Sequence, residues 1–183
     1  MSNILITGRP GSGKGTQAVL LADRLGIPHI STGDIFREHM RAGTPLGIQI
    51  TDSMNAGQYT SDEITNAVIQ ERLAEDDAKD GFILDGYPRT LNQVEFLDSI
   101  NVRIDSVIDL HIDEDLAVNR LLLRAQEQER GDDTEDVIRG RMGTYARTVT
   151  PVLDEYKSRG VLAEFSAVGK VADIHRRLLK ALA

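Results

Sequence analysis

Short apolar runs alternate with amphipathic segments along the whole chain. The runs have the length of buried strands, and the segments between them carry apolar residues at helical spacing. This alternation is typical of βαβ crossovers, so it predicts an α/β fold in which helices flank a parallel sheet of five strands. No internal repeat or low-complexity linker interrupts the pattern, and we expect a single domain over residues 1–183. The predicted strands are residues 3–7, 28–31, 81–84, 105–111 and 161–165.

The interval at residues 32–80 has no predicted strand and is more polar than the rest of the chain. A helix is predicted over residues 44–55. Thr60 and Glu63 have the spacing of a capping box, which would start another helix. We interpret the interval as an inserted helical subdomain.

A glycine-rich segment, GRPGSGKGT at residues 8–16, joins the first predicted strand to a predicted helix. Its glycines can take positive φ and wrap phosphate oxygens with backbone N–H groups, at a helix N-terminus that favours anions. Lys14 would reach the β- and γ-phosphates as a point charge. Gly15 stands where Ser or Thr normally follows the lysine, so direct metal ligation by the later hydroxyl of Thr16 is in doubt. The segment predicts a P-loop rather than a structural turn, since its spacing, lysine, strand and helix all agree.

An aspartate, Asp85, ends the predicted strand in the segment FILDGYPRT at residues 82–90. A phosphate-bound cation prefers oxygen ligands and keeps several waters, so this carboxylate beside a P-loop predicts a Mg²⁺ site that acts through water. Arg89 follows after a turn and would point its guanidinium into the same crevice. Gln93, one helical turn later, offers an amide that suits a nucleobase edge.

Polar residues also follow other predicted strands. Thr32 and Arg37 come after the second strand, where open α/β sheets bind ligands, and a second substrate could sit there. Helix capping alone also explains the residue types at this position. Arg120 and Arg124 lie four apart on one predicted helix face, a repulsive placement that suits a bound anion, although a solvated face explains it equally well.

Three loops are further candidates for ligand contact. The loop at residues 57–60 is either a turn that needs glycine or a backbone contact to a ligand. A polar stretch near residues 126–133, which contains Arg130, would form part of a mobile lid, and closure would bring Arg130 and Arg141 toward the phosphates. Gly169 marks a turn after the last predicted strand, where the backbone could contact a base.

Composition narrows the function classes. The net charge of -8 argues against nonspecific nucleic-acid binding, and sixteen arginines against five lysines suit bidentate phosphate recognition at local sites. The absence of cysteine excludes disulfides and a thiolate zinc site, and the four histidines lack metal-ligand spacing, so each is read as a core or surface histidine. No signal peptide or membrane-length apolar run is found, and we expect a cytoplasmic protein that does not bind membranes.

Taken in order, these segments resemble the adenylate kinase family along essentially the whole chain. GRPGSGKGT resembles the family's G-x-P-G-x-G-K-G-T loop, which normally carries glycine after the lysine. STGDIFR, MNAGQYTSDE, FILDGYPRTLNQ and AVGKVADI each resemble a family segment in its proper place. The resemblance implies a P-loop nucleoside triphosphate-binding fold that transfers a phosphoryl group reversibly from ATP to AMP, giving two ADP, with Mg²⁺.

The resemblance also implies a division of the chain. A core would comprise residues 1–31, 62–124 and 137–183, with a helical AMP-binding insertion at 32–61 and a short lid at 125–136. The short lid lacks the insertion that carries zinc in some bacterial members, so no zinc is expected. We expect a monomer whose partners are ATP, AMP and ADP.

The residue roles are carried over position by position. The resemblance implies ATP contacts at Gly11, Ser12, Gly13, Lys14, Gly15, Thr16, Arg124 and Gly169. It implies AMP contacts at Thr32, Arg37, Gln58, Tyr59, Thr60, Gly86, Tyr87, Pro88, Arg89, Gln93, Arg130 and Arg141. It implies catalytic charge neutralisation by Lys14, Arg89, Arg124, Arg130 and Arg141, with Asp85 holding Mg²⁺ through water.

Two residues depart from the family pattern: Arg9, where a smaller residue is usual, and Glu129, where relatives often have glycine. We expect Arg9 to project into solvent. The nearest alternative is a UMP/CMP kinase, whose members typically carry alanine and asparagine where this chain has Thr32 and Gln93. A non-catalytic nucleotide sensor is the alternative from another class, but it should have lost a charge-neutralising residue, and all are present.

Overall fold

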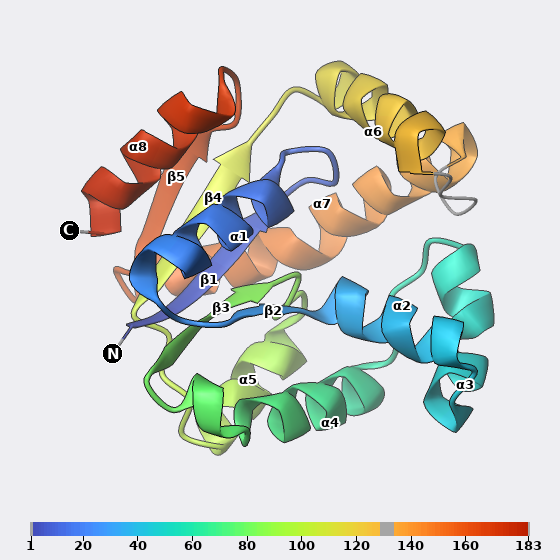
Figure 1. The fold of residues 1–183 in the computed structure, drawn as a ribbon, viewed down its shortest axis with the longest axis horizontal. Helices are drawn as coiled ribbons and strands as arrows, with labels where there is room; N and C mark the ends of the chain where they lie inside the picture. The colour runs from blue at the N-terminus through green and yellow to red at the C-terminus, as the bar shows by residue number, and fades with distance from the viewer. Residues whose placement is uncertain (1, 129–133, 183) are drawn as a thin grey trace.

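A five-stranded parallel sheet forms the centre of the molecule (Figure 1). The structure, a computed structural model, describes residues 2–128 and 134–182. The strand order is β2-β3-β1-β4-β5, and every neighbouring pair is parallel. The predicted α/β fold is confirmed, and each predicted strand end lies within two residues of the observed one. The strands are β1 (Ser2–Gly8), β2 (His29–Ser31), β3 (Gly81–Asp85), β4 (Ser106–His111) and β5 (Leu162–Ser166).

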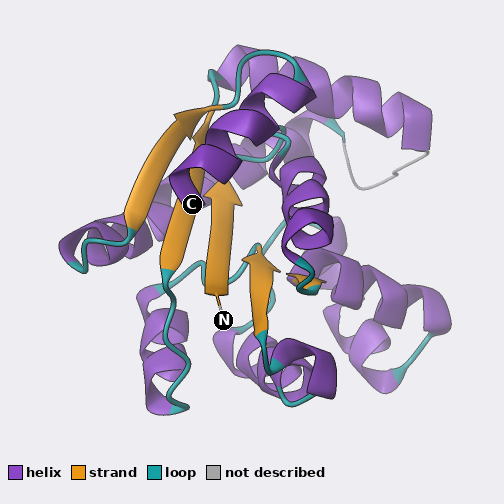
Figure 2. Ribbon diagram, turned by 60° about the vertical axis from the view of Figure 1, so that its left-hand side comes forward, coloured by secondary structure: helices purple, strands orange, loops and turns teal. Residues whose placement is uncertain are grey.

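Helices cover both faces of the sheet (Figure 2). Alternate residues of β1 explain this arrangement: Ile4 and Ile6 join a core with α1 (Lys14–Leu25) and α8 (Val171–Leu182), whereas Leu5 joins the opposite core. The opposite core includes α5 (Leu91–Ser99) and the second half of α7 (Glu135–Ser158). Because both faces are buried, the strands appear in the sequence as continuous apolar runs.

Between β2 and β3 the chain forms α2 (Thr32–Ala42), α3 (Pro45–Asn55), α4 (Asp62–Leu73) and the 3₁₀ helix η1 (Asp76–Ala78). The described residues of this interval contain no strand, as predicted. Helices α2 and α3 form a hairpin so tight that a Cβ at Gly47 would overlap the backbone of α2. In Figure 1 this hairpin projects away from the sheet, beside the start of α7.

The capping-box prediction for the start of α4 is wrong by one residue. Ser61, not Thr60, is the N-cap, and its Oγ accepts a hydrogen bond from the backbone N–H of Ile64 at 3.4 Å. Thr60 is instead buried at the edge of the cavity described below. Because Thr60 is buried, the next hydroxyl residue along the chain, Ser61, caps the N-terminus of α4.

After β4, helix α6 (Glu114–Gln128) leads away from the sheet and α7 returns to it. Thr134 caps α7 by accepting a hydrogen bond from the N–H of Val137 at 3.4 Å. Residues 129–133 of the expected lid lie outside the described residues. Within residues 2–128 and 134–182, no helix is long and apolar enough to cross a membrane.

Candidate active site

A cavity of about 520 Å³ opens at the carboxyl ends of the strands. Residues of the P-loop, of the turn after β3, of α2, of the loop before α4 and of α7 line its wall. Segments that lie far apart in the sequence therefore meet where open α/β sheets bind ligands.

The P-loop wraps the N-terminus of α1. Gly11 has a φ of 84°, and a Cβ there would lie 2.6 Å from the backbone oxygen of Ala117 in α6, so this position requires glycine. Gly13, with a φ of 83°, is the N-cap, and no side chain caps the helix. The positive end of the α1 dipole therefore faces the cavity, and Lys14 is part of the cavity wall.

Asp85 ends β3 directly beside the P-loop and is buried, with 7% of its surface exposed. Its Oδ2 lies 3.3 Å from Nε2 of His29 on the neighbouring strand β2. A Cβ at Gly15 would lie 3.4 Å from the same oxygen. This is an ordinary van der Waals distance, so the structure places residue 15 beside the carboxylate but does not itself require glycine there.

The charge of Asp85 is set by opposing effects. Burial alone raises the pKa of this carboxyl, but the positive charges of Lys14 and Arg89 and the hydrogen bond with His29 outweigh burial. The net result is a pKa below the ordinary value. Asp85 is therefore a carboxylate at neutral pH, which is the form that binds a cation.

Thr32 and Arg89 meet at the backbone oxygen of Gly86. The Thr32 hydroxyl donates to this oxygen at 3.1 Å, and Nε of Arg89 donates to it at 2.7 Å. The guanidinium also stacks over the ring of Tyr59, 4.5 Å from its centroid. The two terminal nitrogens of Arg89 donate to no described residue. Arg89 is thus fixed through Nε and Tyr59, while the fork remains available to an anion.

Gln93 has both ends of its amide hydrogen-bonded within the protein. Its Oε1 accepts from the backbone N–H of Arg89 at 2.7 Å, and its Nε2 donates to Asp62 at 2.7 Å. Asp62 also accepts from the hydroxyl of Thr90 at 2.9 Å. The amide retains one N–H and one lone pair, so it is held in a fixed orientation with capacity for one further partner of each kind.

Helix α7 closes the cavity against the loop at residues 57–60. A Cβ at Gly57 would lie 2.8 Å from Val137 and 3.3 Å from Nε of Arg141, so the loop contacts the helix closely. Further along α7, the Tyr145 hydroxyl lies 3.2 Å from Oγ1 of Thr7 and joins the cavity wall. Arg141 lines the same cavity as the P-loop.

A family model described as adenylate kinase matches residues 6–161. The chain belongs to the adenylate kinase family. Among its relatives, an adenylate kinase of Nocardioides sp. is 47% identical over 98% of this chain and 96% of its own length. An adenylate kinase of Clavibacter michiganensis is 47% identical over 100% of this chain and 94% of its own length. One of Thermobifida fusca is 44% identical over 98% of this chain and 97% of its own length.

Most of the residues predicted from the adenylate kinase resemblance line this one cavity. Ser12 does not, and its buried hydroxyl has no hydrogen-bond partner in the described part of the chain. Gly169 also lies away from the lining, although its φ of 127° confirms the predicted turn. Arg130 and the side chain of Arg124 lie outside the described residues. Those in the lining are Gly11, Gly13, Lys14, Gly15, Thr16, Thr32, Arg37, Gln58, Tyr59, Thr60, Asp85, Gly86, Tyr87, Pro88, Arg89, Gln93 and Arg141.

Three residues beside this cavity make contacts that the sequence analysis did not predict. His29, read as a core or surface histidine, contacts the carboxylate of Asp85. Asp62 orients Gln93 across 31 positions of sequence. Arg120, considered as an anion ligand, donates to the backbone oxygen of Ala167 at 3.3 Å and lines the cavity. Each contact depends on tertiary proximity, and no local pattern signals it.

The two departures from the adenylate kinase pattern have different outcomes. Arg9 is partly exposed and lies 3.7 Å from Glu114, so an ion pair joins the P-loop to the start of α6. The expected projection of Arg9 toward solvent agrees with its 39% side-chain exposure. Glu129 lies outside the described residues.

Proposed function

We propose that this cavity binds ATP and AMP together and holds them for direct phosphoryl transfer. As a member of the adenylate kinase family, the chain is an ATP:AMP phosphotransferase that converts ATP and AMP reversibly into two ADP. The observation that carries the site assignment is a single cavity lined both by the P-loop and by Arg37, Arg89 and Arg141.

On the donor side, the amides of residues 11–16 would hold the phosphates of ATP, and Lys14 would neutralise the β- and γ-phosphates. The position of these amides around the N-terminus of α1, whose positive dipole end favours an anion, supports this assignment. Contacts of ATP with Ser12, Arg124 and Gly169 remain part of the proposal through the family resemblance alone.

Adenylate kinases use Mg²⁺ with ATP, and the residues present here fit that ion. Asp85 is an ionised, buried carboxylate beside the P-loop, and the missing side chain at Gly15 leaves room in front of it. Mg²⁺ keeps several waters, so one carboxylate acting through them is a sufficient protein contribution. When held there by Asp85 through water, the ion would supply positive charge that neutralises the charge developing on the phosphates.

On the acceptor side, the fork of Arg89 would bind the phosphate of AMP, with Arg37 and Arg141 as further cations in the same wall. Thr32, Gly86 and the loop at residues 57–60 would surround the nucleoside. Gln93 would present its remaining N–H and lone pair to the adenine edge, held in place by Asp62 and Arg89.

The chemistry asks the protein for positioning and charge neutralisation rather than for a nucleophile or a strong base. Lys14 and the cavity arginines supply the positive charge, and Arg124 and Arg130 would add to it. A closing lid at residues 125–136 would exclude water, which competes with AMP for the phosphoryl group. We also propose the division into core, AMP-binding insertion and lid, a monomeric state and a cytoplasmic location.

Acceptor specificity tests the proposal. Purified protein with ATP and Mg²⁺ is given AMP, CMP, UMP or GMP, and diphosphate formation is followed by a coupled assay. We expect kcat/KM for AMP to exceed that for each other acceptor by at least about a hundredfold, because Gln93 and Thr32 form a polar pocket of fixed geometry. Equal or higher turnover with CMP or UMP would instead assign the acceptor pocket to a pyrimidine nucleotide.

A further inference from the structure

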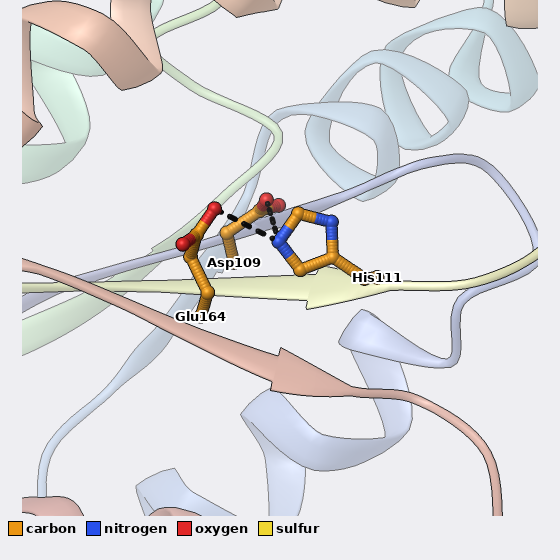
Figure 3. A group of neighbouring side chains, drawn as sticks. All are labelled: Asp109, His111 and Glu164. Carbon is orange, nitrogen blue, oxygen red and sulfur yellow. Dashed lines mark hydrogen bonds and ion pairs between the residues drawn. The ribbon is translucent and has the colours of Figure 1, made fainter.

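Asp109, His111 and Glu164 form a cluster outside the cavity, on one face of the sheet (Figure 3). Asp109 and His111 are two positions apart on β4, so their side chains point to the same face. Glu164 on β5 is the register partner of Asp109. One ligand atom from each side chain lies within 4.8 Å of the other two. Neither the phosphoryl transfer nor the family resemblance assigns a role to these three residues.

The spacing of these atoms is that of ligands around one ion. Nε2 of His111 lies 3.1 Å from Oδ2 of Asp109 and 3.2 Å from Oε1 of Glu164. Two ligands bound at about 2.1 Å to a single ion are separated by roughly 3.0 Å in octahedral geometry and roughly 3.4 Å in tetrahedral geometry. The two separations from the histidine fall between these values, and the two carboxylate oxygens lie within 4.8 Å of each other.

Hydrogen bonding alone leaves the cluster incompletely satisfied. Asp109 is 3% exposed, and its Oδ1 accepts a long hydrogen bond of 3.4 Å from the Tyr145 hydroxyl. Nε2 of His111 carries at most one proton, and the hydrogen bond of suitable geometry is the one with Glu164. Oδ2 of Asp109 therefore accepts no hydrogen bond from the described residues. A buried carboxylate in that position gains much from a cation.

The surrounding charges leave the cluster negative. The cluster has two carboxyl groups and one imidazole; burial raises the pKa of Asp109, and the positive charges of His111 and, less strongly, of Arg9 lower it. Arg9 is itself 3.7 Å from Glu114, and both side chains are exposed to solvent, which screens the pair. The side chains of His111 and Glu164 are each about half exposed, so an ion from solvent can reach them.

We propose that Asp109, His111 and Glu164 bind one divalent d-block cation such as Zn²⁺, with water completing the coordination. A mixed imidazole and carboxylate set favours Zn²⁺ and similar ions over Mg²⁺, which is bound by oxygen ligands alone. The exposed side of the cluster provides the position for water.

This site differs from the zinc site excluded by sequence analysis. That expectation rested on the absence of cysteine and on the spacing of the histidines. The present cluster needs one histidine only, with a carboxylate two positions earlier and another supplied by the neighbouring strand. Pairing of β4 with β5 creates the third ligand, 53 positions away from the histidine.

Binding at this position would tie β4 to β5 beside the cavity wall. Tyr145, which donates a hydrogen bond to Asp109, also contacts Thr7 near the end of β1, just before the P-loop. An ion that binds the folded chain and not the unfolded one raises its stability by mass action. We therefore expect the cation to raise the melting temperature in proportion to the logarithm of its free concentration.

The test measures Zn²⁺ binding to nucleotide-free, metal-stripped protein by isothermal titration calorimetry. We expect one site per chain with a Kd tighter than about 10 µM. His111→Gln and Glu164→Gln should each weaken binding by at least roughly tenfold. Glu95→Gln, an exposed carboxylate on α5, and Asp85→Asn, the candidate Mg²⁺ ligand, should leave the zinc affinity unchanged.

Two readouts guard against misfolded variants. Without zinc, His111→Gln should keep the wild-type circular dichroism spectrum and the wild-type rate of phosphoryl transfer with Mg²⁺. Co²⁺ in place of Zn²⁺ should give visible d–d absorption bands that disappear in His111→Gln. The proposal is overturned if zinc binding does not saturate at one site, if His111→Gln binds as tightly as wild type, or if binding is lost in Asp85→Asn instead.

Discussion

Arg89 is the residue whose loss should separate catalysis from folding most clearly. It enters the cavity wall, and its terminal nitrogens donate to no described residue, so we assign them to the phosphate that is transferred. Loss of one preorganised donor to developing negative charge costs roughly 2.7–4 kcal/mol, or about a hundredfold to a thousandfold in rate. Arg89→Ala removes at least one such donor. We therefore expect kcat/KM for ADP formation to fall by at least about a hundredfold.

The effect of Arg89→Ala on stability should be much smaller. The substitution loses the hydrogen bond from Nε to Gly86 and the stacking on Tyr59. A hydrogen bond from a charged group contributes about 1.5–3 kcal/mol, and an exposed cation–π contact about 0.5–1 kcal/mol. Arg89 is only partly buried, so the sum is an upper limit, below the roughly 5–15 kcal/mol of a typical domain. The variant should stay folded.

A coupled assay of ADP formation and a urea unfolding curve measure the two effects. Arg89→Lys keeps the charge but loses the planar fork and the Nε contact, so its activity should fall between wild type and Arg89→Ala. Arg103→Ala is the matched control, because Arg103 is 87% exposed and lies outside the cavity. If Arg89→Ala retained activity within about fivefold of wild type, the assignment of Arg89 to the transferred phosphate would be wrong.

Three further predictions address the loop, the acceptor pocket and acid stability. Gly11→Ala should abolish activity and lower the urea midpoint, because residue 11 has a φ of 84° and its new Cβ would lie 2.6 Å from the backbone of Ala117. Unchanged activity and an unchanged midpoint would contradict the loop geometry. Tyr59→Leu releases Arg89 from its stacking partner, which costs roughly 0.5–1 kcal/mol, so KM for AMP should rise a few-fold while KM for ATP changes little. Equal effects on the two nucleotides would argue against this role of Tyr59. A hydrogen bond from an arginine lowers the pKa of Asp98 below its ordinary value, and the opposing effect of burial is smaller. The stability that this carboxylate gives the folded chain is therefore complete above the unfolded pKa near 3.9, and it is lost as pH falls through the folded pKa. Urea midpoints should therefore separate wild type from Asp98→Asn at pH 6 and converge below about pH 4, and a constant difference would refute the linkage.

Local sequence signals predicted the helices and strands and the position of the glycine-rich loop between β1 and α1. The strands are apolar runs because both sheet faces are buried, and the P-loop and Asp85 occupy contiguous motifs at strand ends. Helix α3 starts at the predicted place because Thr44 and Pro45 are local start signals. These features depend on neighbours in the chain.

What the sequence could not predict depends on which strands become neighbours. His29 reaches Asp85 only because β2 pairs with β3, and Glu164 reaches His111 only through the β4–β5 register. Burial overrode local chemistry at Thr60, where the predicted cap residue lies in the cavity wall instead. Gln93 was predicted from the family pattern, but its bond to Asp62 emerged only from the fold.

The central claim is that one cavity transfers a phosphoryl group directly from ATP to AMP. The most direct test is the stoichiometry of products in a reaction of purified protein with equal amounts of Mg²⁺-ATP and AMP, separated by ion-exchange chromatography. The account predicts that ATP and AMP disappear one for one, that two ADP form for each pair, and that no inorganic phosphate accumulates. Conversion of ATP to ADP and inorganic phosphate with AMP unchanged would contradict it.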